Sequence, residues 1–155
     1  MSSAPNFEAL FLKIMETLRP IRDQKAALQT VCEILVTDVP HYDWVGFYLV
    51  EPDSSRELAL GPFEGAKTEH LRIAFGEGIC GQAAEREEIF MVPDVSKETN
   101  YLSCSPEVRS EIVIPIFKAG KLWGELDIDS HQVAAFSKRD EIFLNRVTEL
   151  LEKLI

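Results

Sequence analysis

The apolar residues of the chain recur at two spacings, one typical of helices and one typical of strands. In residues 6–18, "NFEALFLKIMETL", they recur every three or four positions, which places them on one face of a helix. The same spacing in 23–35, "DQKAALQTVCEIL", puts Cys32 on an apolar face. We therefore expect Cys32 to be a small core residue, since free cysteine is among the most buried residue types. A third long helix is expected over 137–155.

Between these helices the apolar spacing changes to that of strands. A glycine-punctuated turn, "GEG", interrupts the strands and leads into a short helix over about 79–87. Near the end, Ser137 is expected to cap the last helix, with Asp140 as its capping-box partner. Strands are expected at 43–50, 57–63, 70–75, 89–95, 110–118 and 121–130. Helices, then mostly strands, then a helix favour an α+β fold with its long helices on one face of a sheet.

Each strand can be divided by parity, because successive side chains point to opposite faces of a sheet. The aliphatic residues of the strands fall into one set, which we expect to pack on the long helices. The sheet face that carries this aliphatic set is expected to be apolar. The opposite face is either open to water, as is usual for antiparallel sheets, or the floor of a ligand pocket. The second set contains acids and amphipathic aromatics: Trp44, Tyr48, Glu111, Asp127 and Asp129.

Length and charge limit the possible partners. With 155 residues, 46% of them hydrophobic, the chain suits a single domain over 1–155, in which 1–38 supply the N-terminal helices and 137–155 the C-terminal helix. It has no apolar run long enough to span a membrane and no secretory signal pattern, so we expect a cytoplasmic protein. The formal net charge of −10 argues against nucleic acid as a partner and favours a small molecule.

Three cysteines, Cys32, Cys80 and Cys104, are not spaced as zinc ligands, and no metal is expected. Cys80 lies at the start of the predicted short helix, where backbone N–H groups favour a thiolate. Cys104 lies in a polar loop near Arg109. Each is either a bystander or a nucleophile; in the second case a neighbouring carboxylic acid can protonate the leaving oxygen.

Six short motifs occur in a characteristic order: "DWVGFYLV", "LALGPFEG", "RIAFGEGICGQAA", "VPDV", "CSPEVRSEIVIPI" and "GELDIDS". Together they resemble the GAF fold and, more narrowly, the free methionine-(R)-sulfoxide reductases. The resemblance implies a six-stranded antiparallel sheet with the terminal helices on one face and a ligand pocket on the other. Cys104 matches the catalytic cysteine of that family, and Cys80 matches its glycine-flanked cysteine. The matching pocket residues are Glu111, Asp127 and Asp129, with Trp44 and Tyr48 as aromatics.

The resemblance implies a cofactor-free reaction in which the Cys104 thiolate attacks the sulfoxide sulfur and becomes a sulfenic acid. A second thiol then forms a disulfide, which thioredoxin or another thiol reduces. The family usually has a further cysteine ten residues before Cys80, and this chain has His70 there. Cys80 or an external thiol is therefore expected to resolve Cys104. The alternative is a GAF domain that senses a small molecule without turnover. As in many GAF proteins, the terminal helices could form a homodimer seam.

Overall fold

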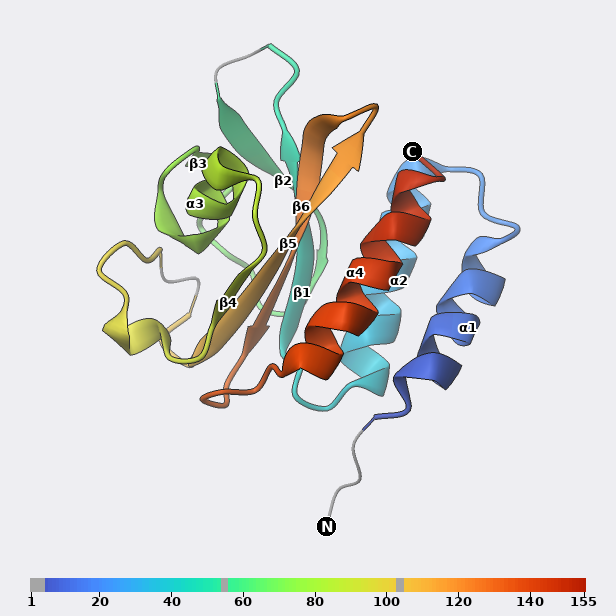
Figure 1. The fold of residues 1–155 in the computed structure, drawn as a ribbon, viewed down its shortest axis with the longest axis horizontal. Helices are drawn as coiled ribbons and strands as arrows, with labels where there is room; N and C mark the ends of the chain where they lie inside the picture. Colours follow the sequence, from blue (N-terminus) through green and yellow to red (C-terminus); the bar gives the residue numbers. More distant parts are fainter. Residues whose placement is uncertain (1–4, 54–55, 103–104) are drawn as a thin grey trace.

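The computed structural model describes residues 5–53, 56–102 and 105–155, and it is built around one antiparallel sheet (Figure 1). The strands lie in the order β3-β2-β1-β6-β5-β4. Along the chain the elements are α1 (Phe7–Leu18), α2 (Gln24–Asp38), β1 (Trp44–Val50), β2 (Glu57–Glu64), β3 (Arg72–Ala74), α3 (Gly78–Arg86), β4 (Phe90–Val92), a 3₁₀ helix (Val95–Lys97), β5 (Ser110–Lys118), β6 (Lys121–Ser130) and α4 (Lys138–Glu152). The predicted α+β class and six-stranded antiparallel sheet are confirmed.

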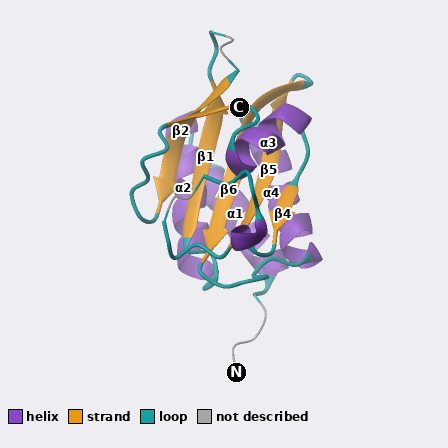
Figure 2. Cartoon of the chain, turned by 90° about the vertical axis from the view of Figure 1, so that its left-hand side faces the viewer, coloured by secondary structure: helices purple, strands orange, loops and turns teal. Residues whose placement is uncertain are grey.

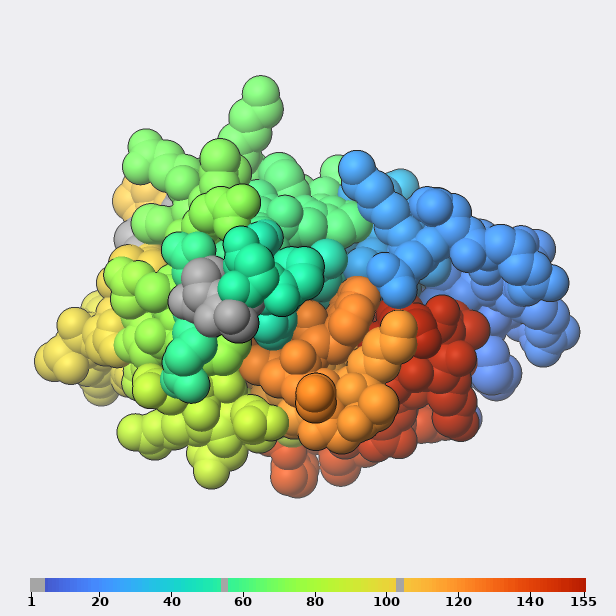
Figure 3. Space-filling model, turned by 90° about the horizontal axis from the view of Figure 1, so that it is seen from above, coloured from blue at the N-terminus to red at the C-terminus, as the bar shows by residue number. Residues whose placement is uncertain are grey.

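Helices α2 and α4 cover one face of the sheet, and α1 packs against these two helices on the side away from the sheet (Figure 1). From above, the N-terminal and C-terminal segments lie together on one side of the β5–β6 hairpin, and the middle of the chain lies on the other (Figure 3). The core between helices and sheet includes Cys32, which is fully buried as predicted. The sheet contributes Val45, Phe47, Ile112, Ile114, Ile116, Leu126 and Ile128 to this core. No helix in the described ranges is both long and apolar enough to cross a membrane.

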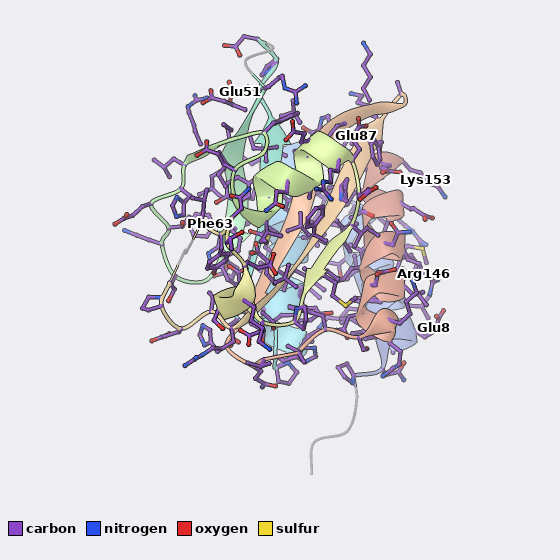
Figure 4. The ribbon with its side chains drawn as sticks, turned by 60° about the vertical axis from the view of Figure 1, so that its left-hand side comes forward. Glu8, Glu51, Phe63, Glu87, Arg146 and Lys153 are labelled. Atoms are coloured by element: carbon purple, nitrogen blue, oxygen red, sulfur yellow. The ribbon has the colours of Figure 1, made fainter. Side chains whose placement is uncertain are left out.

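Helix α1 is attached to α4 by an apolar and a charged contact. The rings of Phe7 and Phe143 stack with their centroids 4.4 Å apart. The Arg146 guanidinium lies 4.1 Å from the centroid of Phe11 and 2.8 Å from Glu8 Oε2. Figure 4 shows Glu8, near the start of α1, and Arg146, about midway along α4, on the same side of the molecule. The N-terminal helix is thus packed on the body of the domain.

A buried carboxylate organises the N-terminus of α4. Asp140 is 4% exposed and accepts hydrogen bonds from the Ser137 backbone N–H at 2.9 Å and Oγ at 3.0 Å, so the predicted capping box is present. Its second oxygen accepts from Tyr42 Oη at 2.7 Å and contacts His41 Nε2 at 3.1 Å. Burial alone would raise the pKa of Asp140, but these hydrogen bonds outweigh it and lower the pKa to about 2. The cluster ties the start of β1 to α4.

The other face of the sheet is covered by α3 and the loops around β3 and β4 (Figure 2). The two edge strands are shorter than the predicted segments 70–75 and 89–95. Strand β3 pairs with β2 only through Arg72–Ala74, and β4 pairs with β5 only through Phe90–Val92. Pro93 follows at once and has no N–H for the ladder, so the chain leaves the sheet there and enters the 3₁₀ helix.

Candidate active site

The acidic residues predicted to share one face of the sheet do so. Across β5 and β6, Glu111 pairs with Asp129, and across β1 and β6, Tyr48 pairs with Glu125. Asp127 is opposite Gly46 on β1. A Cβ at position 46 would collide with the ring of Trp44, so glycine is what the close packing beside Asp127 allows. The parity argument is confirmed, and it places the acids on the side away from the long helices.

Helix α3 lies over these acids at close range because of two glycines. Gly78 has a φ of +64°, a conformation that favours glycine, at the first turn of the helix. A Cβ on Gly81 would collide with the carbonyl oxygen of Ala74 on β3. The intervening Cys80 is therefore held against the sheet, 4% exposed, with its Sγ 3.9 Å from Glu111 Oε2. Ligand atoms of Cys80, Glu111 and Asp127 all lie within 4.8 Å of one another.

A small, nearly closed cavity separates α3 from the sheet. Its free volume is about 10 Å³, roughly the room of one water molecule. Leu102 closes one side, next to Gly78. His70, the residue that stands ten positions before Cys80, is part of the wall. The lining residues are Tyr48, His70, Ile73, Glu77, Gly78, Ile79, Cys80, Leu102, Glu111 and Asp127.

Four carboxylates are buried on this face, and three of them have at least one oxygen without a hydrogen-bond partner among the described residues. Glu111, Glu125, Asp127 and Asp129 are between 0% and 5% exposed. Among the described residues, neither oxygen of Glu125 completes a hydrogen bond, nor does one oxygen each of Asp127 and Asp129. Burial raises the pKa of Glu125 and of Asp129 well above the usual range, and the Asp127 charge adds to both. Burial also raises the pKa of Asp127.

The same surroundings control Cys80. Burial, followed by the charges of Asp127, Glu125, Glu111 and Asp129, raises the pKa of the Cys80 thiol well above its ordinary value. The predicted preference for a thiolate at this helix start is therefore wrong, because burial and four nearby carboxylates outweigh the helix N-terminus. In this structure Cys80 is a free, buried thiol among acids, and its surroundings favour the protonated form.

The two predicted aromatics lie on the same face but at different places. Tyr48 is fully buried, lines the cavity, and donates from its hydroxyl to the backbone oxygen of His70 at 2.9 Å. Trp44 donates from Nε1 to the backbone oxygen of Ala66 at 2.9 Å and stacks on Phe63. In the described part of the chain, neither Trp44 nor Asp129 lines the cavity; both lie beside it. Substrate binding by Trp44 and Tyr48 stays a prediction.

Cys104, the predicted catalytic thiol, lies outside the described residues.

Glu125 was not predicted as a site residue, although the strand parity that selected Asp127 and Asp129 places Glu125 on the same face. Glu125 is absent from the cavity wall and lies within the electrostatic influence of Cys80. It was missed because alternation assigns a face but does not reveal an unpartnered, fully buried carboxylate.

A sheet with long helices on one face and a nearly closed acidic pocket under a short helix on the other defines an α+β domain with a buried acidic pocket. The family description "GAF domain" matches residues 23–155. The chain is 38% identical over 151 residues to GAF domain-containing protein A of Dictyostelium discoideum, covering 97% of this chain and 93% of that protein. The chain therefore belongs to the GAF-domain family.

Within that family the chain is similar to free methionine-R-sulfoxide reductases, as the motifs indicated. It is 35% identical over 130 residues to the Escherichia coli protein of that name, covering 84% of this chain and 76% of the relative. A solved structure of free methionine-R-sulfoxide reductase from Neisseria meningitidis in complex with its substrate superimposes with a TM-score of 0.92 at 34% identity. That superposition covers 99% of this chain and 92% of the other.

Proposed function

We propose that this protein reduces free methionine-(R)-sulfoxide to methionine. The observation that carries the proposal is the closed pocket in which Cys80, Glu111 and Asp127 converge, in a chain similar to reductases of this substrate along most of its length. The proposed enzyme is a single domain over 1–155 that uses thiols and no cofactor. Such chemistry suits the reducing cytoplasm.

The pocket has the charge that an amino-acid substrate requires. Free methionine sulfoxide carries an α-ammonium group, and the unpartnered oxygens of Asp127 and Asp129 offer a negative, desolvated environment for such a cation. The free volume of about 10 Å³ is far smaller than this substrate. Binding therefore requires the wall beside Leu102 to move outward. Tyr48 and Trp44 would supply apolar ring surface beside the substrate's chain.

In the proposed first half-reaction the Cys104 thiolate attacks the sulfoxide sulfur. A pocket carboxylic acid, Glu111, Asp127 or Asp129, gives its proton to the sulfoxide oxygen, which supports loss of that oxygen from sulfur. The bond between the two sulfurs then breaks as the hydroxyl group moves to Cys104, so methionine leaves as the thioether and Cys104 becomes a sulfenic acid. The raised pKa values of Asp127 and Asp129 support this role, because these groups hold a proton at higher pH than ordinary carboxylic acids.

In the proposed second half-reaction the Cys80 sulfur attacks the Cys104 sulfenic acid. A disulfide forms, the sulfur–oxygen bond breaks, and the Cys80 proton leaves with the hydroxyl group as water. Because its surroundings raise the pKa of Cys80, deprotonation must accompany the attack, and Glu111 Oε2 at 3.9 Å is near enough to accept the proton. Thioredoxin or another thiol would then reduce the disulfide. With His70 at the position where relatives have a further cysteine, Cys80 carries this step alone.

The direct test is an assay of methionine release from the R and S epimers of free methionine sulfoxide, with dithiothreitol or thioredoxin as reductant. We expect turnover of the R epimer and none above background in Cys104→Ser. Cys32→Ser is the matched control, since Cys32 is buried in the helix-side core and should leave turnover unchanged. Turnover with dithiothreitol but not thioredoxin would show that Cys80 does not resolve Cys104. No release with either reductant would overturn the proposal.

A second candidate function is a non-catalytic sensor, and the closed cavity favours it because a sensor can couple ligand entry to movement of its wall. Signalling would then pass through a partner or a homodimer. Leu12 on α1 and Ile142 on α4 are 48% and 55% exposed, which supports the proposed dimer seam on these helices. A nucleotide or other small ligand that raises the melting temperature, without sulfoxide turnover, would favour the sensor.

A further inference from the structure

The pocket brings together one sulfur and several carboxylate oxygens, which are atoms that can bind a metal ion. The proposed reductase reaction does not need a metal. We propose that Cys80, Glu111 and Asp127 form a binding site for Zn²⁺. Their ligand atoms, one sulfur and two carboxylate oxygens, lie within 4.8 Å of one another, and all three residues are at most 5% exposed. They come from α3, β5 and β6, so the fold, not sequence spacing, brings them together.

The unsatisfied acids point to a cation independently of that clustering. Asp127 is 1% exposed, lines the cavity, and has an oxygen without a hydrogen-bond partner among the described residues. Buried polar atoms are nearly always paired with protein, water or an ion, so an orphaned carboxylate oxygen facing a cavity calls for an occupant. The nearby Glu125 and Asp129 add orphaned oxygens of the same sign. The surroundings thus favour a positive ion.

The distances between the donor atoms and the free volume of the cavity are close to what a bound Zn²⁺ ion requires. Zn²⁺ binds sulfur at about 2.3 Å and oxygen at about 2.0–2.2 Å, so tetrahedral donors lie roughly 3.3–3.8 Å apart. Cys80 Sγ and Glu111 Oε2 are already 3.9 Å apart, and the whole set needs to contract by about 1 Å. A free volume of about 10 Å³ has room for an ion or one water.

The donor chemistry selects the metal class. Calcium and magnesium take oxygen ligands, whereas a thiolate with carboxylates suits Zn²⁺ and related borderline ions. Binding replaces the thiol proton: Cys80 loses H⁺ to solvent as its sulfur bonds to the ion. The resulting site has three formal negative charges against two positive ones. The mixed sulfur and oxygen set is therefore expected to prefer Zn²⁺ to Mg²⁺.

The proposed Zn²⁺ binding depends only on Cys80, Glu111 and Asp127. The expected inhibition of the reductase by Zn²⁺ rests on the proposed function. An ion at this place occupies the carboxylates that would meet the substrate's ammonium group and holds the thiol that would resolve Cys104. Zn²⁺ would then inhibit the reductase, and free methionine-(R)-sulfoxide would compete with the ion. Failure of competition or inhibition would count against the shared pocket, and failure of metal binding would count against the zinc site itself.

The test uses the reduced, chelator-treated full chain, titrated anaerobically with Co²⁺ and then Zn²⁺. We expect about one ion per chain and a near-ultraviolet sulfur-to-cobalt charge-transfer band that Zn²⁺ abolishes. Cys80→Ser should remove the band and weaken binding at least about tenfold. Cys32→Ser is the matched control for a buried thiol on the other side of the sheet, and it should change neither. Cys104→Ser should also retain the band.

A second pair of variants keeps the proposal testable if Cys80→Ser does not fold. Glu111→Gln and Asp127→Asn leave the thiol in place, so they should retain a weaker charge-transfer band while lowering affinity about tenfold. A band that persists in Cys80→Ser, or that vanishes in Cys104→Ser, would overturn the assignment. Equal affinity for Mg²⁺ and Zn²⁺ would also overturn it, because an acidic cluster without the sulfur would then explain the binding.

Discussion

Two buried acidic residues, Asp140 and Glu125, lie on opposite sides of the sheet and have opposite surroundings. Asp140 has four polar contacts, from His41, Tyr42 and the Ser137 backbone and side chain. Glu125 is 0% exposed and has no completed hydrogen bond among the described residues. Burial raises the pKa of Glu125, whereas hydrogen bonds lower that of Asp140 to about 2 despite burial.

The difference in hydrogen bonding between these two carboxylates distinguishes a residue that stabilises the fold from one that is available for a functional role. A carboxylate whose oxygens are all paired within the protein has nothing left to offer a ligand, and its value is stability. A buried carboxylate without partners lowers stability and persists where another role requires it. The Asp140 cluster is accordingly a joint between β1 and α4. We infer that the acids under Cys80 serve as a binding and proton-transfer surface.

The largest expected effect is on stability, at Asp140. Asp140→Ala leaves the buried Tyr42 hydroxyl unpaired and removes the cap of α4, so the free energy of unfolding should fall by about 3–5 kcal/mol. Urea unfolding with an unchanged m-value would measure it. Asp23→Ala is the control: Asp23 caps α2 through one exposed hydrogen bond to Ala26, and its loss should cost about 1 kcal/mol. Equal costs at both sites would contradict the role assigned to the cluster.

The next effect is on activity, at Asp127. Asp127→Asn keeps the shape of the side chain but removes its charge and its carboxylic proton. We expect kcat/KM for free methionine-(R)-sulfoxide to fall about 100-fold, which is about 2.7 kcal/mol, while the free energy of unfolding stays equal or rises. Asp140→Asn should show the reverse, with lower stability and nearly normal kcat/KM in the folded fraction. Loss of stability without loss of activity in Asp127→Asn would erase the distinction.

Acid pH should reveal the Asp140 cluster. The folded pKa of Asp140 is about 2 against an ordinary 3.8, so the unfolded state binds a proton more readily and the carboxylate stabilises the fold above pH 3.8. This contribution of about 2 kcal/mol should be lost as pH falls from about 5 to 2. Urea unfolding across this range would measure the slope. Asp140→Asn should flatten it, and an unchanged slope in that variant would refute the assignment.

The fold was largely predictable because its local rules are strong. Alternation along β5 and β6 placed Glu111, Asp127 and Asp129 on one face, and spacing in the last helix identified Ser137 as its cap. These predictions depend on residues that are close in sequence. The lengths of the two edge strands were overestimated. The length of an edge strand depends on how many residues of the neighbouring strand it pairs with, and that number is set only when the sheet assembles.

The site was predictable only in part, because its chemistry comes from contacts across the fold. Cys80 and Glu111 are 31 positions apart, and no local spacing indicated that their side chains meet. The helix start at Cys80 suggested a thiolate, but the sequence did not show four carboxylates beneath it, which reverse the direction of the pKa shift. Packing of α3 on the sheet also determines that the cavity is too small for the substrate.

The smallest expected effect is a gain in stability at Glu125. Glu125→Gln removes a fully buried carboxyl group whose oxygens have no hydrogen-bond partner among the described residues, and the new amide can donate toward unpartnered oxygens nearby. We expect the free energy of unfolding at pH 7 to rise by about 1 kcal/mol, measured in urea with a chelator present so that no metal contributes. Glu33→Gln, on the exposed face of α2, should change stability by less than about 0.5 kcal/mol. A loss of stability in Glu125→Gln would show that this carboxylate, like Asp140, holds the fold together, and the contrast between the two faces of the sheet would then fail at its most buried residue.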